Sequence, residues 1–304
     1  MALPYHWQRR LERWKNSLRN IFSGGDHQPR PKLCPACNAL VGITATRCHE
    51  CGTSLRFSLA AITKNLPVVS NLESPVSTIM LGLNFFLFAI LLMFTIQAGE
   101  AGGFNILWRM DFLATVKLGA VHPYPIFAQH EWWRLITAMF LHGGLIHIGF
   151  NMMTLMQFGP AVEELYGSPR FLFLYTFTGA VGFLFSALRL HFSVGASGAL
   201  LGIIGAVLAV TTKRGGAYMR DLRTRLISSL VFLFAIGLWG GIAIDNWAHA
   251  GGLAAGFLLG KLFADRQPMN NAEKMRAQIL GWIAGLAIVA SFVLMLLHFR
   301  DGAS

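Results

Sequence analysis

Ser197 is the first candidate for chemistry because it stands between two glycines, Gly195 and Gly198, at the start of a long apolar run. A hydroxyl in that place has two explanations, close helix packing or nucleophilic catalysis. Serine is a weak nucleophile and needs an adjacent base to accept its proton. His249, in the stretch DNWAHAGG at the start of a later apolar run, is a histidine that could serve. The two residues are far apart in the sequence, so such a role depends on whether the fold brings them together.

Further polar side chains lie within the apolar stretch HGGLIHIGFN, residues 142–151. His147 and Asn151 are four residues apart, so on a helix they would share one face and point at one spot. Polar groups at membrane depth are costly without partners and usually face the protein interior. Hydrogen bonding between helices would explain a lone Asn. His142 and His147 beside Asn151, together with the serine–histidine pair, favour a functional site.

The composition places these residues in a membrane protein. Hydrophobic residues make up 54% of the 304 residues and charged residues only 13%, which is outside the soluble norm. A helix needs about 17–25 apolar residues to span a bilayer. We expect an all-α polytopic protein with seven spans, near residues 78–98, 140–158, 171–190, 197–212, 226–243, 247–264 and 279–298.

Basic residues predict the orientation of these spans. They gather in residues 1–32, after the fourth span and after the sixth, which seven spans place on one side of the membrane. The positive-inside rule makes that side cytoplasmic, so the N-terminus is inside and the C-terminus outside. Ser197 and His249 then lie at the same depth, near the outer face. The two loops carry Lys213, Arg214, Arg220, Arg223 and Arg225, and Lys261, Arg266, Lys274 and Arg276.

All four cysteines of the chain lie in the stretch CPACNALVGITATRCHEC, residues 34–51. Cys34 and Cys37 form one CxxC pair, and Cys48 and Cys51 form another. Two such pairs can complete a tetrahedral Zn²⁺ site, and four sulfur ligands leave no open position for chemistry. The alternatives are two disulfides, which a reducing cytoplasm disfavours, or a redox pair, which normally comes singly. We predict a small structural zinc ribbon on the cytoplasmic side.

The chain divides into segments of different composition. Residues 1–30 begin with an amphipathic pattern of Trp, Leu and Phe between basic residues, which would lie along the bilayer or pack on this protein. We expect the zinc ribbon over 31–56, a linker over 57–77 and the membrane core over 78–265. Residues 266–304 would hold a connecting loop and the seventh span.

Four of these motifs together resemble the rhomboid family of intramembrane serine proteases: WR at 133–134, HGGLIHIGFN at 142–151, GASG at 195–198 and AHAGG at 248–252. The resemblance covers roughly residues 78–265. It implies a six-helix core, so the run at 279–298 would be an extra C-terminal helix. The stretch GPAVEELYGS, residues 159–168, resembles the family's turn between the second and third spans.

The resemblance also implies a role for each site residue. Ser197 would attack the scissile carbonyl, and His249 would act first as general base and then as acid. The Ser197 N–H, His147 and Asn151 would form the oxyanion hole, with His142 in support and no catalytic cofactor. Trp133, Arg134 and Glu163 would be structural anchors. The family often has an aromatic residue four positions after the serine, where this sequence has Leu201.

The substrates follow from the same resemblance. We expect single-span membrane proteins, cut near the outer face of the bilayer. The compact loops and the predicted topology suit a bacterial inner membrane. The zinc ribbon would bind a cytoplasmic partner or regulate the protease, and no nucleic acid is expected. The alternatives are a catalytically inactive, client-binding relative, which the presence of both Ser197 and His249 disfavours, and a transporter. A transporter predicts an internal repeat, and the sequence has none visible by eye.

Overall fold

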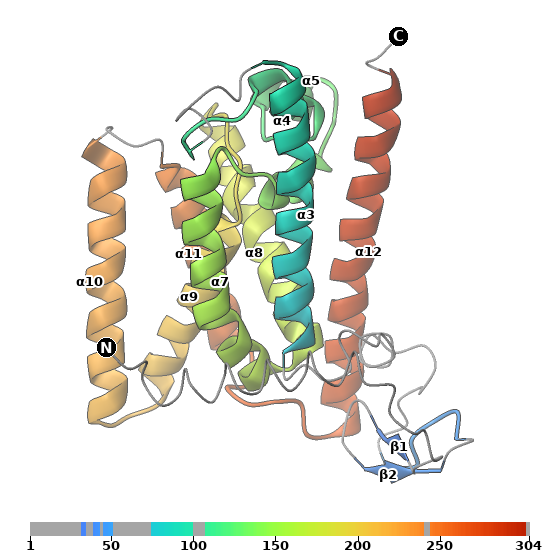
Figure 1. Ribbon diagram of the computed structural model, residues 1–304. Coiled ribbons are helices and arrows are strands. Elements are labelled where there is room, and N and C mark those ends of the chain that lie inside the picture. Colours follow the sequence, from blue (N-terminus) through green and yellow to red (C-terminus); the bar gives the residue numbers. More distant parts are fainter. Residues whose placement is uncertain are drawn as a thin grey trace, which may run out of the picture.

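Long helices account for most of this computed structural model, which describes residues 32–34, 39–42, 45–50, 74–99, 107–239 and 244–301. Seven helices in the described part have 17 or more residues: α3 (Pro75–Gln97), α7 (Leu145–Tyr166), α8 (Ser168–Leu188), α9 (Ser197–Lys213), α10 (Ala217–Trp239), α11 (Asn246–Leu262) and α12 (Asn271–Asp301). Short helices join α3 to α7: α4 (Phe112–Lys117), α5 (Pro123–Ala128), α6 (Arg134–Thr137) and the 3₁₀ helix η2 (Ala138–Phe140). The long helices stand side by side, with α10 and α12 on opposite flanks (Figure 1).

The length and hydropathy of these helices confirm the prediction of an all-α polytopic membrane protein. Among the described residues, α3, α8, α10 and α12 are each long and apolar enough to cross a bilayer. The pair formed by residues 134–140 and α7 passes the same test together but is bent by 93°. α9 is apolar but shorter, with 17 residues. Each of the seven long helices overlaps one of the seven predicted spans, and a count of seven crossings stays a prediction.

Two of the predicted boundaries are wrong. The second span was expected over 140–158, but the chain bends before α7, which continues past Pro160 to Tyr166. The stretch 159–168 is therefore mostly helix, and the turn to α8 is at Gly167. Arg220, Arg223 and Arg225 were placed in a loop, but α10 begins at Ala217 and includes them.

Glycines let α9 and α11 approach each other at backbone distance, as the four-residue spacing of Gly252, Gly256 and Gly260 in the sequence predicts. A Cβ atom on Gly252 would collide with the carbonyl oxygen of Gly198, and one on Gly256 with that of Gly202. Small residues permit such close packing in membranes, where apolar surface alone does not draw helices together. α9 is consequently buried along most of its length, including Gly198, Gly202 and Gly205.

Hydrogen bonds and ion pairs of charged side chains connect neighbouring helices at their ends. The Glu163 carboxylate accepts hydrogen bonds from the N–H groups of Val76 and Ser77, at the start of α3, at 3.0 and 2.8 Å. This confirms Glu163 as a structural anchor, and it suits the electropositive N-terminus of a helix. At the same end of the bundle, Arg214 donates to the Asp265 carboxylate at 2.7 Å. That hydrogen bond lowers the pKa of Asp265, so the pair keeps its charges into the acidic range.

The cysteine-containing segment is described only in part. Strands β1 (Lys32–Leu33) and β2 (Leu40–Val41) pair antiparallel, near the N-terminal end of α12 (Figure 1). Cys34 and Cys48 are buried and share a small cluster with Val41. Cys37, Cys51 and the predicted amphipathic segment and linkers at 1–30 and 57–73 lie outside the described residues. The predicted domain boundaries stay predictions.

Candidate active site

Ser197 is the first residue of α9, and its side chain is half-buried. Gly195, two residues earlier, has φ +121°, a conformation that glycine adopts more readily than other residues. This turn leads the chain directly into the helix. The first N–H groups of a helix have no intrahelical acceptor, and they lie at its electropositive end. Ser197 therefore presents a hydroxyl and an N–H where negative charge is favoured.

The backbone before Ser197 is held on both sides. Ser193 and Val121 exchange two backbone hydrogen bonds, of 3.0 and 3.1 Å. The Gly195 N–H donates to the carbonyl oxygen of Ala138 in η2 at 2.9 Å. The Ala196 N–H points at Nε2 of His142, at 3.5 Å. We call residues 193–197 the Ser197 loop, and its position depends on residues 119–142 as well as on α9.

His142 lies in the break before α7 and not on a helix, whereas a continuous span was expected over 140–158. Its side chain is fully buried, and its ring meets that of His147 edge-on, with centroids 5.1 Å apart. The break needs glycine, because a Cβ on Gly144 would lie 2.7 Å from the backbone of Trp108. His142 touches the Ser197 loop from the side of η2, as a supporting residue would.

His147 and Asn151 lie on one face of α7 and turn toward the Ser197 loop. A Cβ built on Gly195 would be 2.7 Å from Nε2 of His147 and 3.5 Å from Nδ2 of Asn151. The Gly143 N–H donates to Nδ1 of His147 at 3.3 Å, so in the neutral ring the proton is on Nε2. The Nδ2 group of Asn151 is buried and has no hydrogen-bond partner among the described residues. Both side chains thus offer N–H donors beside the Ser197 loop.

His249 lies in the first turn of α11 and is buried, with 5% of its surface exposed. Its chain neighbour Ala248 faces Gly198, the neighbour of Ser197: a Cβ on Gly198 would lie 3.5 Å from the Ala248 carbonyl oxygen. The contact between α9 and α11 therefore brings the serine and histidine segments together. Nδ1 of His249 has no hydrogen-bond partner among the described residues.

Leu201 does not supply an aromatic ring, but one reaches His249 from α10. Leu201 is 4% exposed within α9. Phe234 of α10 meets the His249 ring edge-on, with centroids 6.3 Å apart. Sequence reasoning missed Phe234 because it is one of several phenylalanines in an apolar run with no distinguishing spacing.

Asp245 is the N-cap of α11. Its Oδ1 accepts the N–H groups of Trp247 and Ala248, both at 3.0 Å, and its Oδ2 accepts from the Ser186 hydroxyl of α8. Aspartate is a favoured capping residue because its side chain satisfies N–H groups that the helix leaves unpaired. This cap fixes the turn that carries His249.

The arrangement combines a hydroxyl at a helix N-terminus, a nearby imidazole and two side-chain N–H donors. A tetrahedral intermediate of acyl transfer needs donors aimed at its oxyanion, and the side chains of His147 and Asn151 both lie beside Gly195, two residues before Ser197. Among the described residues no group of three His, Cys, Asp or Glu side chains could hold a metal ion.

A known protein family matches the part of the chain that contains this site. The Rhomboid domain matches residues 129–266, a segment that contains His142, His147, Asn151, Ser197 and His249. The cysteine-containing segment and α12 lie outside it.

Individual relatives extend the similarity. RHOMBOID-like protein 6, mitochondrial, of Arabidopsis thaliana is 36% identical over 206 residues, which are 61% of this chain and 66% of that protein. Rhomboid protease GluP of Bacillus subtilis (strain 168) is 34% identical over 178 residues, 57% of this chain and 33% of that protein. The rhomboid-related protein YdcA of the same bacterium is 33% identical over 196 residues, 64% of this chain and 90% of YdcA. The chain thus spans less than two thirds of the first two relatives and nearly all of YdcA.

Proposed function

The chain belongs to the rhomboid family, and from that premise we propose that it is an intramembrane serine endopeptidase. The observation that carries the proposal is the contact of Gly198 with Ala248, which joins the Ser197 and His249 segments beside the N–H donors of α7. A binding protein would not need a hydroxyl, an imidazole and oxyanion donors in one place. The name of GluP, a rhomboid protease, supports the same activity.

In the proposed reaction His249 accepts the Ser197 proton while the serine oxygen bonds to the carbonyl carbon of the substrate. The resulting oxyanion is stabilised by the Ser197 N–H, Nε2–H of His147 and Nδ2–H of Asn151. His249 then donates its proton to the leaving amine, and the peptide C–N bond breaks. A water molecule, deprotonated by the same imidazole, hydrolyses the acyl-enzyme and releases Ser197.

The proposed substrates are single-span membrane proteins cut near the outer face of the bilayer. The site lies near the ends of α9 and α11 and not midway along them, so a segment that unwinds at the membrane surface could reach Ser197. We propose the bacterial inner membrane as the location. Because one relative is named mitochondrial, an organelle membrane is the alternative, and fractionation of the source cells distinguishes the two.

A fluorophosphonate probe tests the activity without a known substrate, because it labels only activated serines. We expect wild-type protein in mild detergent to be labelled and Ser197→Ala and His249→Ala to lose the signal. Removal of one oxyanion donor, by His147→Ala or Asn151→Ala, should slow labelling by about 10²–10³-fold. No labelling of folded wild type would instead support the inactive, client-binding alternative.

We propose further that Cys34, Cys37, Cys48 and Cys51 hold one structural Zn²⁺ ion. One cysteine of each pair, Cys34 and Cys48, lies buried in the same small cluster, as two halves of one site would. The zinc would fix the segment as a docking module for a cytoplasmic partner. Elemental analysis should find one zinc per chain in wild type and none after Cys37→Ser and Cys51→Ser together. Wild type without bound metal would contradict the proposal.

A further inference from the structure

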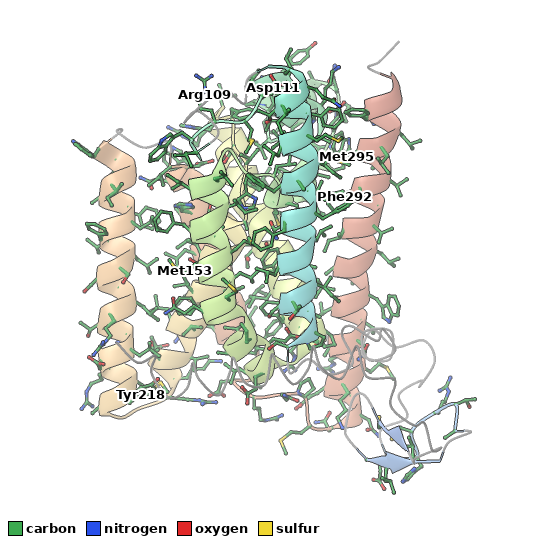
Figure 2. The ribbon with its side chains drawn as sticks, in the orientation of Figure 1. Arg109, Asp111, Met153, Tyr218, Phe292 and Met295 are labelled. Atoms are coloured by element: carbon green, nitrogen blue, oxygen red, sulfur yellow. The ribbon has the colours of Figure 1, made fainter. Side chains whose placement is uncertain are left out.

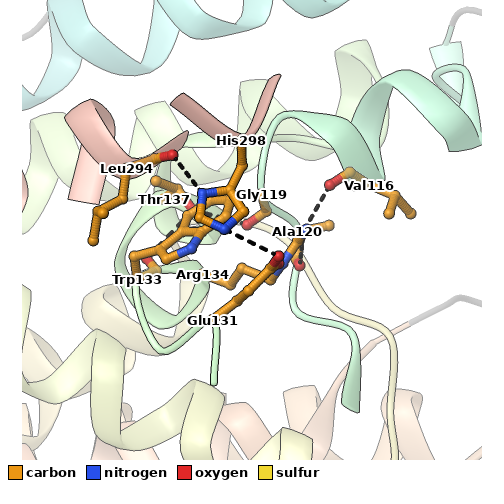
Figure 3. Close-up of polar contacts among 9 residues, drawn as sticks. All are labelled: Val116, Gly119, Ala120, Glu131, Trp133, Arg134, Thr137, Leu294 and His298. Carbon is orange, nitrogen blue, oxygen red and sulfur yellow. Dashed lines mark hydrogen bonds and ion pairs between the residues drawn. The ribbon is translucent and has the colours of Figure 1, made fainter. Parts of the chain in front are cut away.

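The C-terminal end of α12 contacts the segment that leads into α6 (Figure 3). Nε2 of His298 lies 3.5 Å from Oε1 of Glu131. The imidazole also packs against the indole ring of Trp133, with centroids 5.4 Å apart. α12 lies beyond residues 129–266, which match the Rhomboid domain, so this contact joins the shared domain to an additional helix.

The hydrogen bonds of His298 direct its second nitrogen at Glu131. Nδ1 lies 3.0 Å from the carbonyl oxygen of Leu294, which can only accept, so Nδ1 carries a proton. A hydrogen bond from Nε2 to the carboxylate requires a proton there as well, and the imidazolium form donates from both nitrogens. The charged ring can therefore bridge α12 and the buried carboxylate of Glu131.

Glu131 also binds Arg134, so it links His298 to that side chain. Its Oε2 accepts from Nε of Arg134, and both side chains are less than a tenth exposed. Arg134 also donates to the carbonyl oxygen of Val116, in the last turn of α4, at 2.6 Å and to that of Ala120, just after α4, at 3.3 Å. A buried ion pair is costly to break because the remaining charge is left uncompensated. The group consequently holds α6 and the end of α4 together, which confirms Arg134 as an anchor.

α6 continues into η2, and η2 touches the Ser197 loop. The carbonyl oxygen of Ala138 accepts the Gly195 N–H at 2.9 Å. At the other end of η2, Phe140 packs on Phe292 of α12, with ring centroids 5.4 Å apart. Figure 2 shows Phe292 on the side of α12 that faces the other helices. α12 therefore supports the segment 131–140 at both ends.

We infer that α12 positions the Ser197 loop, and that His298 is a positioning residue of the active site. The inference rests on the proposed function, because the position of the loop matters for catalysis only if Ser197 reacts. The contacts run from His298 through Glu131 and Arg134 to α6, and from η2 to Gly195. The additional helix is thus part of the support of the site and not only a membrane anchor.

A matched pair of variants tests this inference. Glutamine can place an N–H where Nε2 of His298 stands, whereas the shorter asparagine reaches only the position of Nδ1. We expect the fluorophosphonate to label His298→Gln within about 2-fold of the wild-type rate. His298→Asn should be labelled about 5–10-fold more slowly than wild type. That loss is smaller than the about 100-fold that a misplacement of one ångström can cause. Leu297→Ala, whose side chain is 50% exposed on the same turn of α12, is the control for the helix itself.

Deuterium uptake of peptides covering 134–141 and 193–197 gives a second measurement that needs no activity. His298→Asn should raise the uptake of both peptides, while His298→Gln and Leu297→Ala should not. An unchanged rate and uptake in His298→Asn would overturn the inference, even if the variant lowered the Tm, because α12 would then only stabilise the fold. If wild type is not labelled, the proposed function fails, and the uptake alone decides whether α12 positions the loop.

Discussion

Gly195 connects the two halves of the candidate site, because its backbone lies against His147 while its N–H is held by Ala138. We expect Gly195→Ala to slow fluorophosphonate labelling by at least about 100-fold, since the new methyl group would displace the His147 ring. The φ of +121° adds strain of about 1–3 kcal/mol for any L side chain. Labelling rates and the Tm in detergent measure the two effects separately.

Gly149→Ala is the matched control for this prediction. Gly149 is on α7, two residues from His147, and a Cβ there meets nothing within 4 Å. Alanine is the better helix former by about 0.5–1 kcal/mol, so the variant should keep its labelling rate and lose no stability. If Gly195→Ala also kept its rate, His147 would not be held by the Ser197 loop as described.

At this scale the sequence predicted the positions that follow from helix geometry. His147 and Asn151 share a face because residues four apart on one helix always do, and the structure turns that face to Gly195. The contact of Phe234 with His249 could not be predicted, since it depends on how α10 packs against the other helices. The place of His142 outside α7 depends on a break that the backbone of Trp108 imposes on Gly144.

Among the elements, the pairing of α9 with α11 decides whether the serine and histidine segments meet. We expect Gly252→Ala to force the helices apart at the level of Gly198, at an overpacking cost of about 1–3 kcal/mol. The Tm should fall, and labelling should slow by about 100-fold if the separation reaches an ångström. Gly285→Ala on α12 is the control, because the nearest atom to its Cβ, in Leu172, is 3.9 Å away. Equal effects of the two variants would contradict the role of this helix pair.

Hydropathy predicted the place of every long helix but not where each one ends. α7 continues past Pro160 to Tyr166 because the Glu163 carboxylate finds N–H donors at the start of α3, a partner that no local pattern reveals. The first turns of α10 contain charged residues, so hydropathy alone does not assign them to a span. They can still be helical, because arginine side chains at a helix end can extend to the membrane surface. The repeat of Gly252, Gly256 and Gly260 predicted the close packing correctly because small residues at that spacing are its direct cause.

The molecule as a whole is electrically asymmetric along the helix axes. Lys213, Arg214 and Arg266 lie at the end of the bundle opposite the Ser197 loop, with Arg220 in the first turns of α10. Tyr218 is at this end, whereas Arg109 and Asp111 lie at the other (Figure 2). From the positive-inside rule we propose that the basic end is cytoplasmic, so that the candidate site would open to the outer face.

Two cysteine substitutions test this orientation in intact expression-host cells. Leu190→Cys lies just before the Ser197 loop and Tyr218→Cys at the basic end, and the native side chains are 75% and 72% exposed. In a background with the four native cysteines changed to serine, a membrane-impermeant maleimide should label Leu190→Cys at once and Tyr218→Cys only after permeabilisation. The reverse result would place Ser197 at the cytoplasmic face. Substrates would then be cut near the inner surface, because Ser197 lies close to one end of the helix bundle in either orientation.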